Sequence, residues 1–155
     1  MLRRACALPA ALLVAALAGC GPGAGSGGSA AVAPPTAAES AVLATLPPEY
    51  RNADLHNGEL HFALCRSCHT IVRDGPDMTG PNLHGVWGRR AGSKPGFAYS
   101  SALKATGWTW DAPALDHWLT DPRAAVPQTK MSFYGLRDDK DRRDLIAWLR
   151  VASSR

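Results

Sequence analysis

The sequence lacks a long apolar run, internal repeats and closely spaced histidines. Its longest apolar run, Ala5 to Ala18, covers only about fourteen residues, too few to span a bilayer comfortably as a helix. There are no internal repeats, and the five histidines are scattered rather than paired at the close spacing of a zinc site. These absences argue against a repeat array and against a structural zinc domain.

The four cysteines do not form the disulfide set of a small secreted protein, because two of them belong to a motif. Cys65, Cys68 and His69 form the string C-R-S-C-H, the attachment site of a c-type haem. The thiols add across the two vinyl groups of haem, and the imidazole of the next residue can bind the iron. The alternatives are a thioredoxin-like dithiol and half of a zinc site. No strand–helix pattern of a βαβ unit precedes Cys65, and no second ligand pair follows.

The second iron ligand decides what such a haem can do. The main candidates are Met78, a short reach from His69, and Met131, which lies far enough along the chain to wrap the ring. A thioether in the sixth position leaves no open site and raises the reduction potential, which favours electron transfer over oxygen chemistry. Taken alone, Met131 could equally be a core methionine. The remaining candidates are the histidines His56, His61, His84 and His117.

Further segments follow the C-R-S-C-H string in a defined order. They are GPNLHGVWGRRAG (80–92), PGFAYS (95–100), GWTW (107–110), DPRAAVPQTKMSF (121–133) and DLIAWL (144–149). With this series, the region from Arg51 to Arg155 resembles class I cytochromes c of the mitochondrial and alpha-proteobacterial kind. The resemblance implies an all-α fold in which N- and C-terminal helices cross around one covalent haem c. It also implies that His69 and Met131 ligate the iron.

The resemblance extends to residues around the haem. It implies that the carbonyl of Pro81 accepts the second imidazole N–H of His69, which fixes the ring and raises its basicity as a ligand. It implies that Arg89 offsets the charge of the haem propionates. The implied donors to those propionates are Tyr99, Trp110 and Thr129.

Two positions depart from the family pattern. Trp118 stands where the family usually has a tyrosine whose hydroxyl bonds to the methionine sulfur, so the strength of the Met131 bond and the potential are open. Gln128 stands where the family usually has glycine. A residue with a Cβ is less free to adopt a positive φ, so the ligand loop is expected to bend differently.

The spacing of apolar residues and the helix start and stop signals predict three helices, with loops between them. The expected helices run from Asn52 or Asp54 to Cys65, from Pro113 to Thr120, and from Asp138 or Asp139 onward. The resemblance implies that the terminal helices cross, with Gly58 and Phe62 of the first meeting Leu145 and Trp148 of the last.

The N-terminus reads as an export signal. Arginines at positions 3 and 4 precede the apolar run, which ends in L-A-G-C (17–20). That string resembles a bacterial lipobox, in which Cys20 is lipidated and residues 1–19 are removed. The alternatives are an ordinary signal peptide and an uncleaved anchor. Several acyl chains on Cys20 would hold the protein firmly on a membrane.

Between the signal and the cytochrome-like region, residues 20–50 are rich in Gly, Ala, Ser and Pro and show no apolar period. This composition predicts a flexible tether, with the folded domain confined to residues 51–155.

The formal net charge of the chain is +4. A basic face would steer the domain toward acidic sites on redox partners.

The resemblance implies a monomeric one-electron carrier on the periplasmic side of a bacterial membrane. Its implied donor is a cytochrome bc complex and its acceptor a terminal oxidase, with no role in nucleic-acid binding. The alternatives are a dedicated redox partner of a periplasmic dehydrogenase or reductase, and a haem enzyme with weak peroxidase activity. The basic residues expected around the haem edge are Arg66, Arg89, Arg90, Lys94, Arg123 and Lys130.

Overall fold

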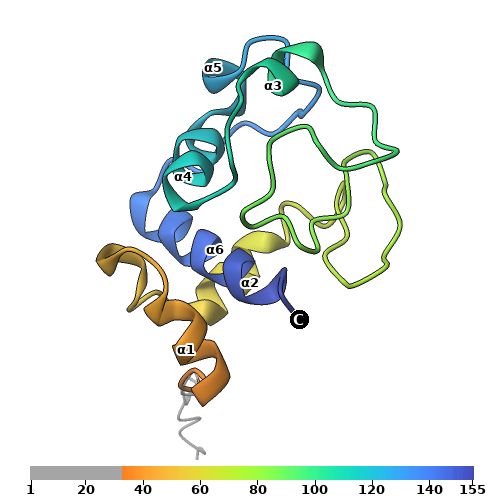
Figure 1. The fold of residues 1–155 in the computed structure, drawn as a ribbon. Helices are drawn as coiled ribbons and strands as arrows, with labels where there is room; N and C mark the ends of the chain where they lie inside the picture. The colour runs from red at the N-terminus through yellow and green to blue at the C-terminus, as the bar shows by residue number, and fades with distance from the viewer. Residues whose placement is uncertain (1–32) are drawn as a thin grey trace, which may run out of the picture. The chain divides into compact units, whose positions relative to one another are not determined.

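The computed structural model describes residues 33–155, and within them the chain is helical (Figure 1). The described part contains no strand, only an isolated bridge between Arg90 and Thr109. The all-α prediction is therefore confirmed, and none of the helices in this part is long and apolar enough to cross a membrane. The elements are α1 (Ala37–Ala44), the 3-10 turn η1 (Pro48–Tyr50), α2 (Leu55–Phe62), α3 (Ser101–Ala105), α4 (Ala112–Thr120), α5 (Pro122–Ala125) and α6 (Asp139–Ala152).

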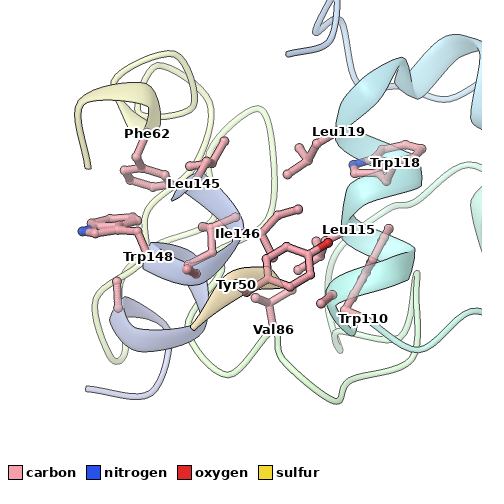
Figure 2. Packing of buried hydrophobic residues seen from close by; sticks show 14 of the residues in the cluster. Tyr50, Phe62, Val86, Trp110, Leu115, Trp118, Leu119, Leu145, Ile146 and Trp148 are labelled. Atoms are coloured by element: carbon pink, nitrogen blue, oxygen red, sulfur yellow. The ribbon is translucent and has the colours of Figure 1, made fainter. Parts of the chain in front are cut away.

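Helices α2 and α6 cross at close range, as the resemblance implies (Figure 1). Gly58 permits the approach, because a Cβ at this position would lie 2.2 Å from the Asp144 carbonyl oxygen. The rings of Phe62 and Trp148 pack at an interplanar angle of 36° with their centroids 4.6 Å apart, next to Leu145 (Figure 2). The crossing joins residues about ninety positions apart in the sequence and closes the fold.

Capping side chains set where these two helices begin. Asp54 caps α2 by accepting from the Asn57 N–H, and Asp138 caps α6 by accepting from the Asp141 N–H. Asp54 also joins the two helices, because its backbone N–H donates to the buried Asp144 carboxylate at 2.9 Å. Aspartate is a preferred N-cap residue, so the predicted starts of both helices were visible in the sequence.

Helix α4 presents one face to the core and begins at the expected place. Asp111 caps it, and its buried side includes Leu115, Trp118 and Leu119 (Figure 2). Helices α3 and α5, by contrast, lie in segments that were expected to be loop. Their five and four residues are too few for an apolar period to appear, so they depend on local caps and tertiary contacts.

The domain begins earlier than predicted, and the assignment of all of residues 20–50 to a tether is wrong for its second half. Helix α1 opens with a capping box between Thr36 and Glu39, and α1 and η1 pack against α6. Leu43, Leu46 and Tyr50 are all buried there. Their spacing of three and four residues is helical, but the surrounding Ala, Pro and Ser hid it.

We call residues 36–50 the N-terminal clasp. The signal peptide over residues 1–19, the lipidated Cys20 and the first part of the predicted tether lie outside the described residues.

Candidate functional site

A cavity of about 600 Å³ opens beside the C-R-S-C-H motif. Its volume lies within the range of about 300 to 1,000 Å³ that is typical of sites for small organic ligands, and its lining is mainly apolar. Each haem-contact residue predicted from the sequence lines this one cavity. They are Cys65, Cys68, His69, Pro81, Arg89, Tyr99, Trp110, Trp118, Thr129 and Met131.

The cavity also separates the rival ligands. Among the described residues, His69 is the only histidine in the lining and Met131 the only methionine. Met78 lies outside it, with its side chain 46% exposed. His61, a possible rival, instead pairs with Asp141 at 3.1 Å. The candidate iron ligands that remain in the cavity lining are the His69 imidazole and the Met131 thioether.

The two cysteines sit where the chain leaves α2. After Phe62 the backbone continues in tight turns, in which the Cys68 and His69 N–H groups both donate to the Cys65 carbonyl, at 3.0 and 2.9 Å. This turn brings both thiols to the cavity wall, and neither is in a disulfide. Burial, and then the nearby Cys68, raises the pKa of the free Cys65 thiol to about 11.

The thioredoxin-like alternative lacks support, because the described residues contain no strand and therefore no βαβ unit before Cys65. The zinc alternative lacks support too. Within residues 33–155 no group of three or more His, Cys, Asp or Glu side chains is arranged to hold a metal ion. The pair of thiols on an apolar cavity fits covalent attachment of a large apolar group.

His69 is held in one orientation from two sides. Its Nδ1 lies 2.7 Å from the Pro81 carbonyl oxygen, the contact that the resemblance implies. A carbonyl can only accept, so Nδ1 donates and Nε2 keeps its lone pair in the neutral ring. Burial lowers the pKa of His69, while the bond to Pro81 opposes that shift, so the ring remains neutral at pH 7.

Gly80 supports the other side of the ring. A Cβ on Gly80 would lie 2.3 Å from His69 Cε1 and 2.7 Å from each ring nitrogen, so only glycine fits without moving the imidazole. The sequence contained Gly80 within the family segment, but its contact with His69 depends on the tertiary structure.

The loop that carries Met131 keeps a left-handed turn despite the departure at Gln128. This glutamine adopts φ +68°. A Cβ makes such a conformation costly, by an amount on the order of 1 kcal/mol, so the surrounding contacts must enforce it. The Met131 N–H donates to the Thr129 hydroxyl oxygen at 3.2 Å, and Lys130 Nζ donates to the Ala98 carbonyl at 2.7 Å. We expected the Met131 loop to bend differently because Gln128 carries a Cβ, but Gln128 adopts the positive φ nonetheless.

Arg142 does not line the cavity, but it holds the segment after Met131 in place, a role that sequence reasoning missed. It is buried on the apolar face of α6, and its guanidinium donates to the Asp116 carboxylate at 2.7 Å. It also donates to the carbonyls of Leu136 and Arg137, at 2.9 and 3.2 Å. These bonds tie α6 and α4 to the segment that follows Met131. The available signal was an arginine at the helical spacing of buried residues.

Trp110 and Trp118 both belong to the cavity lining. The ring centroids of Trp110 and Trp118 are 5.7 Å apart, and both side chains are buried. Among the described residues no hydrogen bond links the Trp118 indole N–H to Met131, whose backbone N–H donates to Thr129. On this geometry Trp118 fills space.

Polar groups gather at the side of the cavity expected to face the propionates. Arg89 Nη1 donates to the His84 carbonyl at 3.3 Å. Burial raises the pKa of Tyr99, and the Arg89 charge opposes the shift. The Thr129 hydroxyl oxygen accepts from Met131, which leaves its O–H free to donate.

These features together define a c-type haem protein. The terminal helices cross, and a large cavity with a mainly apolar lining lies beside the two cysteines. An oriented histidine follows the cysteines, and a methionine belongs to the same lining. No family model matches the chain. It is 46% identical to a cytochrome c of Gibberella zeae over 98 residues, which cover 63% of this chain and 92% of that protein. It is 45% identical to a cytochrome c2 of Rhodomicrobium vannielii over 100 residues, 64% and 80% of the two chains. A cytochrome c2 of Rhodoplanes tepidamans is 42% identical over 96 residues, 62% and 90% of the two chains.

The chain belongs to the cytochrome c family. Accordingly, it is an electron-transfer protein with one covalently attached haem c, and not an enzyme.

Proposed function

We propose that the protein is a one-electron carrier on the periplasmic side of a bacterial membrane, with His69 and Met131 as the two axial ligands of its haem. The observation that carries the ligand assignment is the cavity lining, which includes one histidine and one methionine among the described residues. Cys65 and Cys68 are the proposed attachment points. Haem, when bound, supplies an iron that changes oxidation state by one electron.

The protein's own residues would hold that iron closed to other ligands. The Pro81 carbonyl and Gly80 orient His69, so that little movement accompanies the change in charge. Arg142 anchors the segment after Met131, which limits departure of the thioether. Apolar walls exclude water and favour the state with the lower net charge, so the potential should be high. Arg89, Tyr99, Trp110 and Thr129 are the proposed partners of the propionates.

Replacement of Met131 by alanine tests the ligand assignment. The variant should keep covalent haem, lose the ferric methionine-to-iron absorption band, and bind carbon monoxide in the ferrous form. Met78→Ala is the matched control, because this methionine is outside the cavity and should leave the spectrum unchanged. Free binding of carbon monoxide to the native protein, or equal effects of the two substitutions, would refute closed ligation and favour the weak-peroxidase alternative.

We also propose that Cys20 carries a lipid that holds the protein at the membrane. The support is the L-A-G-C string after a basic and apolar N-terminus. Cys20→Ser should then yield a soluble protein that still contains haem, detected by membrane fractionation. Retention of the variant on washed membranes would identify residues 5–18 as an uncleaved anchor instead.

The proposed donor is a cytochrome bc complex and the proposed acceptor a terminal oxidase. The support is the similarity to cytochromes c2 together with the net positive charge. The second candidate is a dedicated partner of one periplasmic dehydrogenase or reductase. Reduction by a purified cytochrome bc complex and oxidation by a purified cytochrome c oxidase, at rates well above those of a non-cognate enzyme, would favour the first.

A further inference from the structure

A second cavity lies between the N-terminal clasp and the helices α4 and α5. Its volume is about 510 Å³, within the range of about 300 to 1,000 Å³ that is typical of sites for small organic ligands. It shares no lining residue with the haem cavity. We call it the acidic pocket. The polar and aromatic residues of its lining are Glu49, Tyr50, Asp116, His117, Thr120 and Asp121.

Helix α4 contributes to both cavities from different faces. Its apolar residues Leu115, Trp118 and Leu119 line the haem cavity, and its polar residues Asp116, His117 and Thr120 line the acidic pocket. Residues three and four positions apart share a face of a helix, so each set forms its own face. A molecule in the acidic pocket would therefore lie behind α4, away from the haem.

The lining of the acidic pocket contains three carboxylates and no lysine or arginine. Glu49 forms no ion pair among the described residues. Asp121 lies 3.4 Å from the Arg137 guanidinium, which is 78% exposed, so the attraction within this pair is weak. Asp116 pairs more closely with Arg142, at 2.7 Å, but this arginine also serves a second carboxylate on α6. The pocket therefore retains negative charge that the protein does not offset.

Tyr50 supplies an observation that is independent of the carboxylates. Its side chain is only 5% exposed, yet no hydrogen bond links its hydroxyl to another described residue. A buried hydroxyl normally has a partner. The residue lines the acidic pocket and not the haem cavity, and Figure 2 shows its hydroxyl on the side of the ring that faces α4. The hydroxyl oxygen is therefore available to accept a hydrogen bond from a molecule in the pocket.

The electrostatic surroundings of this hydroxyl are negative. Burial, and then the charges of Asp116 and Glu49, raise the pKa of Tyr50, and the opposing charges of two arginines have smaller effects. The hydroxyl thus stays protonated at pH 7, and a positive group beside it would be stabilised.

We infer that the acidic pocket binds an organic cation, a guanidinium or primary ammonium group carried on a short apolar chain. Glu49 and Asp121 would face the charge, and the Tyr50 hydroxyl oxygen would accept one N–H. The apolar chain would contact Ala124 and Ala125 of α5, which belong to the same lining. Within the described part of the chain no side chains are arranged to hold a metal ion, which favours an organic cation. Neither the haem nor a redox partner takes part, so the inference goes beyond the proposed function.

Binding in this pocket should also stabilise the clasp. Glu49 and Tyr50 belong to the clasp, whereas Asp116 and Asp121 belong to the segment from α4 to α5. The pocket is therefore complete only while the clasp is docked. A ligand that binds only the docked form shifts the equilibrium toward that form, so protease cleavage within residues 36–50 should slow.

The test uses the full-length haem-loaded protein and two ligands of the same shape but different charge. Butylguanidinium is the cation, and butylurea is its neutral isostere. Isothermal titration calorimetry at low ionic strength should show saturable binding of butylguanidinium with half-saturation on the order of 1 mM, tighter than butylurea by about tenfold or more. Bound butylguanidinium should slow cleavage of the clasp, whereas butylurea should not. The haem spectrum should stay unchanged, because the two cavities share no residue.

Two substitutions that keep side-chain shape locate the binding. Glu49→Gln and Tyr50→Phe should each weaken the binding of butylguanidinium by about fivefold, the effect of one lost hydrogen bond or charge contact. Glu59→Gln is the matched control, because it removes the same charge from an exposed carboxylate outside the pocket. It should leave the dissociation constant within about twofold, since exposed charges interact weakly at a distance.

A second arm identifies the source of the cation. A short peptide with blocked ends and one central arginine presents the guanidinium group as a protein side chain would. Tighter binding of this peptide than of butylguanidinium assigns the pocket to a basic side chain of a partner protein, and weaker binding assigns it to a small molecule. Equal binding of butylguanidinium and butylurea, or no saturable binding of either cation, would overturn the inference. An equal loss of affinity in Glu49→Gln and Glu59→Gln would overturn it as well.

Discussion

Replacing Leu46 with alanine tests whether the N-terminal clasp is part of the folded domain or only the end of a tether. Leu46 has a relative exposure of 1%, and it lies between α1 and η1, which both pack against α6. The Leu46 carbonyl also accepts from Arg51 Nε at 2.9 Å, which fixes the turn. The substitution removes buried methyl groups but leaves this backbone contact in place.

The expected loss of unfolding free energy follows from how completely the Leu46 side chain is buried. Leucine-to-alanine changes at fully buried positions cost about 2.7 to 5 kcal/mol, and the low end applies where neighbours can close the gap. The clasp consists of one short helix and one 3-10 turn, which can shift to close part of the gap, so we expect a loss of about 3 kcal/mol. With an unfolding entropy of about 2.1 cal/mol/K per residue over about 120 residues, this loss lowers the Tm by about 12 °C. If the clasp detaches before the rest unfolds, the loss is smaller, but protease cleavage within residues 36–50 increases.

The assay is denaturant unfolding of the haem-loaded protein, followed by tryptophan fluorescence, together with limited proteolysis. Leu60→Ala is the control, because its side chain is 59% exposed and its removal should cost less than about 0.5 kcal/mol. The haem spectrum should be unchanged in both variants. Equal unfolding midpoints and equal cleavage of residues 36–50 in the two variants would refute the docked clasp.

Two further substitutions probe the cavity. Gly80→Ala places a Cβ 2.3 Å from His69 Cε1, so the ring must tilt; we expect a disturbed haem spectrum and a loss of about 1 to 3 kcal/mol in unfolding free energy. Trp118→Phe should shift the midpoint potential by less than about 20 mV, because no hydrogen bond links Trp118 to Met131 among the described residues. Loss of a hydrogen bond worth about 1 kcal/mol would instead shift the potential by about 40 mV. The same change should lower stability by about 1 to 2 kcal/mol through lost burial, which thermal unfolding measures.

Sequence patterns were informative where the chemistry is local in the chain. The spacing of Cys65, Cys68 and His69 specifies haem attachment without any knowledge of the fold, because one turn of chain brings all three groups together. Helix starts were visible for a similar reason, since an N-cap such as Asp54 or Asp138 acts within three residues. The family resemblance added the residues that gather around the cavity from distant segments.

The sequence misled where composition was averaged over a window. Residues 20–50 are dominated by small residues and proline, and the three apolar side chains of the clasp are too few to form a clear period. Their burial depends on α6, which lies about a hundred positions further along the chain. Helices α3 and α5 were missed because so short a segment has no periodicity of its own.

What the sequence by itself determined is the cofactor chemistry: two thiols and a histidine at fixed spacing, and a methionine far enough away to reach the other face. Only the tertiary structure decided which methionine enters the cavity, since Met78 and Met131 differ in burial and not in chemistry. It also decided that Arg142 is a buried clamp and that Tyr134 is exposed. Whether a side chain faces water or protein depends on segments that are remote in the chain, and no local pattern carries that information.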